Sequence, residues 1–302
     1  MAWAAGCRSA ESAATAGPDL NVILCNGRRA EAADLVALAM RNHGHFTTMQ
    51  VRDGAVRGLD LHLARLREAT TELFDVALDD ARVLDGLRRG MEIAGSGDCT
   101  ARVSVCAREF ERAAQAAQPL VAGDLDVVVA LTPPADPAPV PMRAASFVHE
   151  RALPHIKHLG TFAQFHLARQ ARGRGFDDVL FTDASGRISE GTVWNLGLWD
   201  GTAVTWPDAP ALRGTCERLL QAGLADLGVP QSRRSVQLDE LPRFRAAFAC
   251  NSRGVRAIAA VDAVAFEPDG ALADLLGRAL ALQPWQPVTA GRAGFPPAPE
   301  FR

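Results

Sequence analysis

The sequence predicts an α+β protein made of two α/β domains. Its 302 residues are enough for two packed cores. Short apolar segments with hairpin signals are mixed with segments of helical spacing, which favours α+β over a doubly wound parallel sheet. A proline-rich segment near the middle of the chain is typical of a linker. The content of hydrophobic residues, 48%, is that of a globular protein.

The N-terminal domain is predicted over residues 19–131, after a flexible, alanine-rich tail over residues 1–18. Four strands are expected, at residues 21–27, 46–51, 101–107 and 125–131. Asp53-Gly54 follows the second of these strands and is a hairpin signal. Residues 59–73 are predicted to be a helix, because their leucines recur at helical spacing.

Residues 132–141 contain five prolines, which neither a helix interior nor a central strand tolerates. This segment is predicted to link the first domain to a C-terminal domain over residues 142–283. The second domain is expected to contain helices at 161–172 and 215–227, strands within 178–199, and two apolar segments within 246–264. Residues 284–302 carry several prolines and are predicted to be an irregular tail.

Composition excludes several classes of function. A formal net charge of -3 gives no reason to expect nucleic-acid binding. The six cysteines include no Cys-x-x-Cys pair, so neither a structural zinc site nor a disulfide framework is expected. No window approaches the roughly 20 apolar residues of a membrane span. We therefore expect a cytoplasmic protein without a bound metal or a membrane partner.

Lys157 is the only lysine, in a chain where Lys and Arg together number 32. An amine can lose its proton and attack a carbonyl, whereas a guanidinium in practice cannot. Lys157 also follows a helix-breaking proline, Pro154, and precedes a predicted helix. These features point to a nucleophile, although a solvated surface lysine is the alternative interpretation.

Some 33 residues after the lysine comes Glu-Gly-Thr-Val-Trp-Asn, at residues 190–195. A lysine followed by a helix, an apolar strand and Glu-Gly-x-x-x-Asn resembles the class IV (fold type IV) pyridoxal-phosphate enzymes. That family includes branched-chain aminotransferases, D-amino acid aminotransferases and aminodeoxychorismate lyases. The resemblance covers roughly residues 21–264 and implies two α/β domains with pyridoxal 5'-phosphate between them, in a homodimer.

The resemblance implies a role for each motif residue. Lys157 would bond the cofactor aldehyde and, once released by substrate, move the proton at the substrate α-carbon. Glu190 would face the pyridine nitrogen and keep the ring protonated. Asn195 matches the end of the same motif. Without Lys157, Glu190 would be interpreted as an exposed acid at a strand end.

Two further segments resemble parts of the family that bind the cofactor phosphate. His-Leu-Ala-Arg-Leu at residues 62–66 is similar to a helix in which the arginine, here Arg65, holds the phosphate. Gly214, Thr215 and Cys216 resemble a turn whose backbone N–H groups cradle it. Cys216 stands where a threonine is usual, and an ordinary helix start is the alternative interpretation. Ser252 is expected to add a contact.

Three residues are candidates for contact with the substrate. Gly-His-Phe-Thr-Thr at residues 44–48 resembles a segment of aminodeoxychorismate lyases, and it makes Thr48 a candidate. His43, just before it, could hold a carboxylate or relay protons, or could be structural. Arg108 follows a strand and could reach a substrate carboxylate, or could be solvated.

The leading functional prediction is a class IV aminotransferase that acts on small amino and keto acids. The second hypothesis is an aminodeoxychorismate lyase that releases pyruvate, and the third is a degenerate, non-catalytic relative. The chain contains no tyrosine. Branched-chain aminotransferases place a tyrosine five residues after the lysine, where this sequence has Phe162, and this counts against that subgroup.

Overall fold

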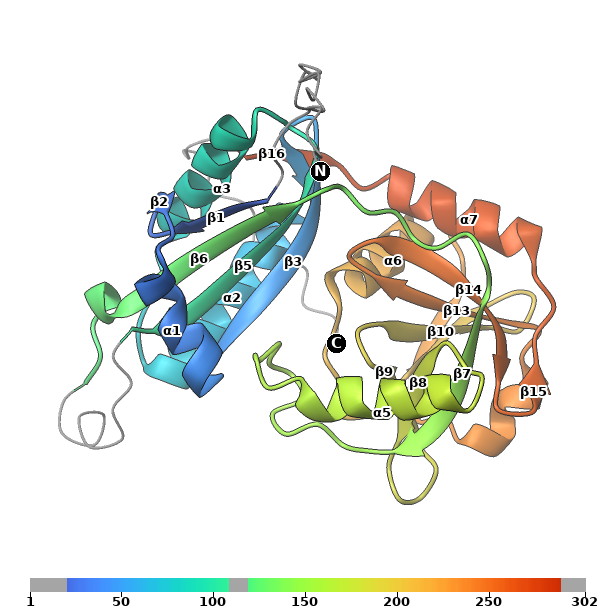
Figure 1. The fold of residues 1–302 in the computed structure, drawn as a ribbon. Helices are drawn as coiled ribbons and strands as arrows, with labels where there is room; N and C mark the ends of the chain where they lie inside the picture. The colour runs from blue at the N-terminus through green and yellow to red at the C-terminus, as the bar shows by residue number, and fades with distance from the viewer. Residues whose placement is uncertain (1–20, 109–118, 289–302) are drawn as a thin grey trace, which may run out of the picture.

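A computed structural model describes residues 21–108 and 119–288 (Figure 1). The predicted tail at residues 1–18 lies outside this range. The described chain forms two β-sheets, each covered by helices, and this is the predicted mixture of strands and helices. The sheets stand side by side, joined by a long connection between β6 and β7 (Figure 1).

The first sheet is antiparallel throughout and has the order β16-β4-β3-β5-β6-β1-β2. Its strands are β1 (Val22–Cys25), β2 (Arg28–Arg29), β3 (Gly44–Arg52), β4 (Ala55–Arg57), β5 (Cys99–Ala107), β6 (Leu125–Thr132) and β16 (Trp285–Pro287). The accompanying helices are α1 (Ala32–Arg41), α2 (Leu59–Phe74), α3 (Asp80–Ala94) and the short 3₁₀ helix η1 (Ala122–Asp124).

Local sequence explains the elements that position the site. Asp53 and Gly54 both have positive φ, 49° and 68°, as a two-residue hairpin turn between β3 and β4 requires. In α2, the buried Leu59, Leu63 and Leu66 recur at helical spacing and pack into the core of the first sheet. The predicted hairpin and helix are therefore confirmed.

The second sheet has the order β12-β11-β10-β13-β14-β7-β8-β9, with β15 paired to β14. Three of its pairings are parallel: β11 with β12, β14 with β7, and β7 with β8. Its strands are β7 (Met142–Val148), β8 (Asp178–Thr182), β9 (Ile188–Gly191), β10 (Asn195–Trp199), β11 (Val204–Pro207), β12 (Gln231–Arg234), β13 (Ala246–Asn251), β14 (Gly254–Val261) and β15 (Val264–Ala265). The helices are α5 (Phe162–Gly173), α6 (Thr215–Asp226), α7 (Gly270–Ala281) and the 3₁₀ helix η2 (Leu238–Arg243).

The structure corrects one predicted boundary. Residues 284–302 were expected to be irregular, but Trp285–Pro287 form β16, which pairs antiparallel with β4 of the first sheet. The chain thus returns from the second half to the first. Prolines are tolerated here because β16 is an edge strand. Residues 133–141, within the predicted linker, contain no helix or strand.

Candidate active site

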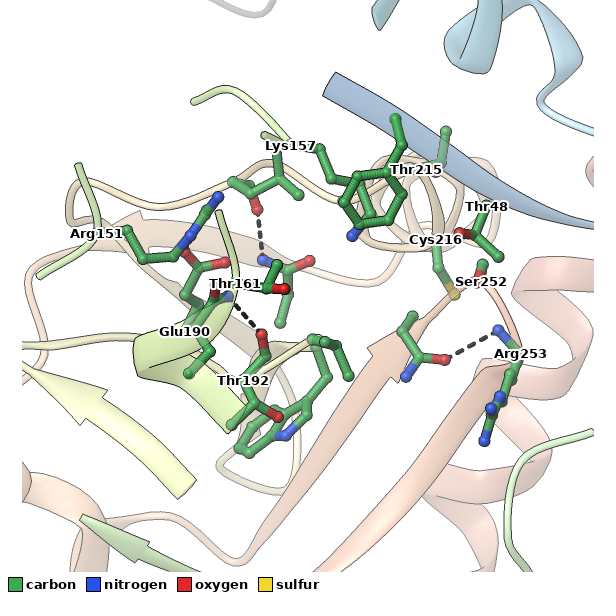
Figure 2. A pocket seen from close by; sticks show the side chains of 18 of the residues that line it. Thr48, Arg151, Lys157, Thr161, Glu190, Thr192, Thr215, Cys216, Ser252 and Arg253 are labelled. Carbon is green, nitrogen blue, oxygen red and sulfur yellow. Dashed lines mark hydrogen bonds and ion pairs between the residues drawn. The ribbon is translucent and has the colours of Figure 1, made fainter. Parts of the chain in front are cut away.

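A cavity of about 280 Å³ contains most of the predicted site residues. Its walls come from β3, β5 and α2 on one side, and from the segment 151–165, β9, β10, the start of α6 and the β13–β14 turn on the other. Figure 2 shows many of the side chains around it. The predicted residues that line the cavity are Thr48, Arg65, Lys157, Glu190, Asn195, Gly214, Thr215, Cys216 and Ser252.

Lys157 lies on a segment that pairs with β3. The backbone N–H of Phe46 donates to the carbonyl of Lys157 at 2.9 Å, and the N–H of Leu159 donates to the carbonyl of Gly44 at 2.9 Å. Gly44 has no room for a side chain, because a Cβ there would lie 2.5 Å from the carbonyl oxygen of Val105. The lysine segment of one half is therefore held against a strand of the other.

The surroundings of Lys157 disfavour a charged amine. Burial lowers its pKa to about 7; Arg65 and Arg151 add to this shift, and Glu190 opposes it. The amine nitrogen lies 4.9 Å from the ring centre of Phe46. An amine with this pKa is partly neutral at pH 7, which is the nucleophilic form. This arrangement does not favour the interpretation of Lys157 as a solvated surface lysine.

We expect the rate of pyridoxal-phosphate uptake by the cofactor-free protein to rise with pH through about 7 and then level off. The folded-state pKa of Lys157 is lowered from 10.5 to about 7, so the amine is protonated below this value and neutral above it. Stopped-flow absorbance over a series of buffers measures the rate. An inflection at about pH 10, where an ordinary lysine titrates, would contradict the prediction.

Glu190 is buried and paired with Arg151, a residue that the sequence interpretation missed. Their side chains are 7% and 6% exposed, and an Nη1–Oε1 distance of 3.0 Å joins them. Burial raises the pKa of Glu190, while Arg151 opposes this rise. Arg151 also donates to the carbonyls of Pro154 at 2.9 Å and Ile156 at 2.8 Å. One guanidinium thus holds both the acid and the lysine segment.

The Glu-Gly-x-x-x-Asn motif has a steric reason in this structure. The indole of Trp194 packs on Gly191, where a Cβ would lie 1.9 Å from an indole carbon. Asp178 accepts hydrogen bonds from the Thr192 hydroxyl at 2.8 Å and from the Trp194 indole N–H at 3.1 Å. The tight turn between β9 and β10 is fixed in this way, and it sets Glu190 at the cavity wall.

Asn195 fixes the chain that leads into α6. Its amide Nδ2 donates to the carbonyl of Leu212 at 2.7 Å. Gly214 must be a glycine here, since a Cβ would lie 2.2 Å from the Asn195 side-chain oxygen. Asn195 lines the cavity, but its recorded contact positions the turn that begins α6.

The start of α6 presents backbone donors to the cavity. Thr215 and Cys216 are the first two residues of the helix, so their N–H groups have no acceptor within it. Ser252 lines the same cavity from the β13–β14 turn. The Cys216 thiol lies 3.9 Å from the Gly254 carbonyl. Replacing the usual threonine by cysteine changes the side chain, while the backbone donors remain available.

Arg65 adds a cation to this end of the cavity. It donates to the carbonyl of Arg213 at 2.9 Å and makes no ion pair with any carboxylate in the described part of the chain. Burial, followed by the neighbouring Arg218, lowers its pKa to about 10. A half-buried guanidinium without a counter-charge is suited to an anion such as a phosphate.

Two predicted substrate residues do not line the cavity. His43 packs edge-on against Phe74, with ring centres 5.4 Å apart. Arg108 forms an ion pair with the buried Asp126 at 2.7 Å. Neither residue lines the cavity that contains the other predicted site residues, and their contact with a substrate stays a prediction. Thr48 does line the cavity, from β3.

Arg102 is a second cavity residue that the sequence interpretation missed. It lies on β5, and its guanidinium carbon is 3.7 Å from the ring centre of Phe46. No carboxylate in residues 21–108 or 119–288 pairs with it. Because the amine of Lys157 also contacts Phe46, a carboxylate on a molecule bound near Lys157 could reach Arg102.

These residues fit pyridoxal phosphate. One cavity is lined by Lys157, whose pKa is lowered, by the buried acid Glu190 and by Arg65, which has no counter-ion. The backbone N–H groups at the start of α6, which have no acceptor within the helix, line it too. They match the aldehyde, the pyridine nitrogen and the phosphate of that cofactor. Among the residues that the structure describes, no cluster could hold a metal ion and no helix could cross a membrane.

Comparison with known proteins agrees with this fit. The sequence matches the amino-transferase class IV family over residues 44–261. A fold IV transaminase from Curtobacterium pusillum has a TM-score of 0.69 and 26% identity, with 84% of this chain and 90% of that chain covered. A 4-amino-4-deoxychorismate lyase from Pseudomonas aeruginosa has a TM-score of 0.70 and 26% identity, with 85% and 97% covered.

A hypothetical aminotransferase from Mycobacterium tuberculosis, solved with pyridoxal phosphate bound, has a TM-score of 0.71. The two sequences are 19% identical, so this similarity supports the fold alone. The alignment covers 86% of this chain and 98% of the Mycobacterium tuberculosis chain. No curated protein sequence matches the chain. The fold and cavity define a pyridoxal-phosphate enzyme, and the chain belongs to the class IV aminotransferase family. The predicted family, fold class and cofactor are confirmed.

Proposed function

We propose that this protein is a pyridoxal-phosphate-dependent aminotransferase that moves an amino group between small amino and keto acids. One observation carries the proposal: Lys157, Glu190 and Arg102 line the same cavity. When bound there, the cofactor supplies an electron sink for the bonds at the substrate α-carbon. Lys157 would hold it and then carry the α-proton, which the lowered pKa favours.

The other cavity residues would bind and orient the cofactor. Glu190, supported by Arg151, would hold a proton at the pyridine nitrogen. Arg65, Ser252 and the amides of Thr215 and Cys216 would hold the phosphate. Asn195 and Gly214 would shape the turn that presents these amides.

We expect Arg102→Gln to raise the KM for keto and amino acids by roughly 10- to 100-fold, with a smaller change in kcat. A charge-assisted contact to a carboxylate is worth about 1.5–3 kcal/mol, and it is present in both ground and transition states. Steady-state kinetics with a series of keto acids measures the effect. Arg102→Lys, which keeps the charge, is expected to recover part of the affinity. An unchanged KM for Arg102→Gln would remove Arg102 from the substrate site.

An aminodeoxychorismate lyase is a second candidate. The segment at residues 44–48 and the 26% identity to the lyase from Pseudomonas aeruginosa favour it. One assay separates the two activities. A lyase releases pyruvate from aminodeoxychorismate in the absence of a keto-acid acceptor, whereas an aminotransferase stops after one turnover until an acceptor is added.

The third hypothesis, a non-catalytic relative, predicts a protein that takes up little cofactor. The recorded contacts argue against it, since the change at Cys216 leaves the backbone donors of the helix start in place. A purified protein that stays colourless with added pyridoxal phosphate would refute both enzyme proposals.

We also propose a homodimer. Two side chains that line the cavity are exposed and apolar, Phe165 at 56% and Val193 at 44%, and Phe162, in the same helix as Phe165, is exposed at 82%. Clustered exposed apolar residues are typical of protein interfaces. Light scattering at several protein concentrations measures the oligomeric state. The cytoplasmic location expected from the sequence stays a prediction.

A further inference from the structure

A second cavity of about 210 Å³ lies next to the first. The two share a wall formed by Thr215, Cys216, Asn251, Ser252 and Arg253. The second cavity extends toward the β3–β4 hairpin, which contributes Arg52 and Arg57, and toward β16, which contributes Trp285. It therefore lies between the two halves of the molecule, beyond the proposed cofactor phosphate site.

This second cavity is rich in positive charge. Arg52 pairs with Asp136 at 3.1 Å. Arg57 and Arg253 also line the cavity, and neither forms an ion pair with any of the residues that the structure describes. Burial lowers the pKa of the neighbouring His62 well below its ordinary value, so that histidine is neutral at pH 7. The guanidinium groups thus outnumber the single carboxylate.

Arg57 is held in place without being neutralised. Its guanidinium carbon lies 4.6 Å from the ring centre of Trp285, in the strand that pairs with β4. The Nε atom is buried and has no hydrogen-bond partner. A buried N–H without an acceptor is costly, and an anion in the cavity would relieve that cost.

We propose that the second cavity binds a small phosphate-type oxyanion, separately from the cofactor phosphate, with Arg57 and Arg253 as its principal ligands. The forked donors of arginine match the geometry of phosphate oxygens. The second cavity, of about 210 Å³, is smaller than the first, of about 280 Å³, and a small anion fits it.

Arg253 lines both cavities, but the other arginines separate the two anion sites. Arg65 lines the first cavity and not the second, whereas Arg52 and Arg57 line the second and not the first. An oxyanion in the second cavity would contact β4 from one half and the β13–β14 turn from the other. Binding would therefore stabilise the folded protein by linkage.

The test is a calorimetric titration of cofactor-loaded protein with inorganic phosphate. In this protein the cofactor occupies the first site, and its content is measured in parallel by absorbance. We expect Arg57→Gln to weaken phosphate binding by roughly tenfold or more and Arg253→Gln by several-fold, because each removes a charge-assisted contact. Arg278→Gln is the matched control, since Arg278 is exposed on α7. It is expected to bind phosphate as the unaltered protein does.

Three results would overturn the proposal. They are absence of phosphate binding to the loaded protein, unchanged binding by both Arg57→Gln and Arg253→Gln, and loss of cofactor together with phosphate in Arg57→Gln. The last would assign Arg57 to the cofactor phosphate. Thermal unfolding without phosphate shows whether Arg57→Gln folds, and Arg253→Gln at its exposed position keeps the test valid if it does not.

Discussion

Lys157→Ala will abolish turnover, with a loss of about 10⁴-fold or more, because the change removes both the nucleophile and the proton carrier. The amine lies in the cavity, and its pKa is lowered to about 7. No second lysine can replace it, because the sequence contains only one. Lys157→Arg will be equally inactive, because a guanidinium retains its proton. Initial rates with a coupled assay measure both variants.

The single lysine also permits a direct chemical test. Reduction of the cofactor-loaded protein with borohydride will attach one cofactor per chain, and peptide mass spectrometry will place it on Lys157. Lys157→Ala will show no attachment. Attachment elsewhere, or an active Lys157→Ala protein, would refute the assignment of the nucleophile and with it the proposed function.

Arg151→Ala will lower the free energy of unfolding by about 3–5 kcal/mol, the range measured when one member of a buried ion pair is removed. Two effects combine. Glu190 loses the cation 3.0 Å from its carboxylate, and the carbonyls of Pro154 and Ile156 lose their donor. The second effect loosens the segment that carries Lys157, so kcat will fall as well. Denaturant unfolding of the cofactor-free protein isolates the stability change from ligand linkage.

A double-mutant cycle tests the pair itself. Glu190→Gln removes the buried charge, so Arg151→Ala combined with Glu190→Gln will be more stable than the sum of the single losses predicts. Activity will not recover in the double variant, because the acid at the pyridine nitrogen is still missing. Strict additivity of the stability losses would show that Arg151 acts on the lysine segment alone.

Much of the site was visible in the sequence because its residue types are rare or specific. One lysine among many arginines predicted the nucleophile, and Glu-Gly-x-x-x-Asn predicted the acid at residue 190; both side chains line one cavity. The leucine spacing of α2 and the Asp53-Gly54 turn predicted their elements correctly. Helix α3 was not predicted, although Asp79 caps its start and Gly95 ends it with positive φ.

Arginines with functional positions could not be recognised in the same way. In a sequence where nearly every basic residue is arginine, the identity of Arg102 or Arg151 carries little information. Their importance follows from contacts with Phe46 and Glu190, which lie far from them along the chain. Arg108 was a candidate from its place after a strand, and in the structure it pairs with Asp126 and does not line the cavity.

The sequence by itself determined the family and the cofactor class and predicted Lys157 as the reactive lysine, because these depend on residue types at fixed spacings. Tertiary structure alone decided which charges meet. Strand β16 returns to β4, the lysine segment pairs with β3, and Arg151 reaches Glu190. Burial and charge pairing depend on distances through space, and folding brings together segments that no local pattern connects.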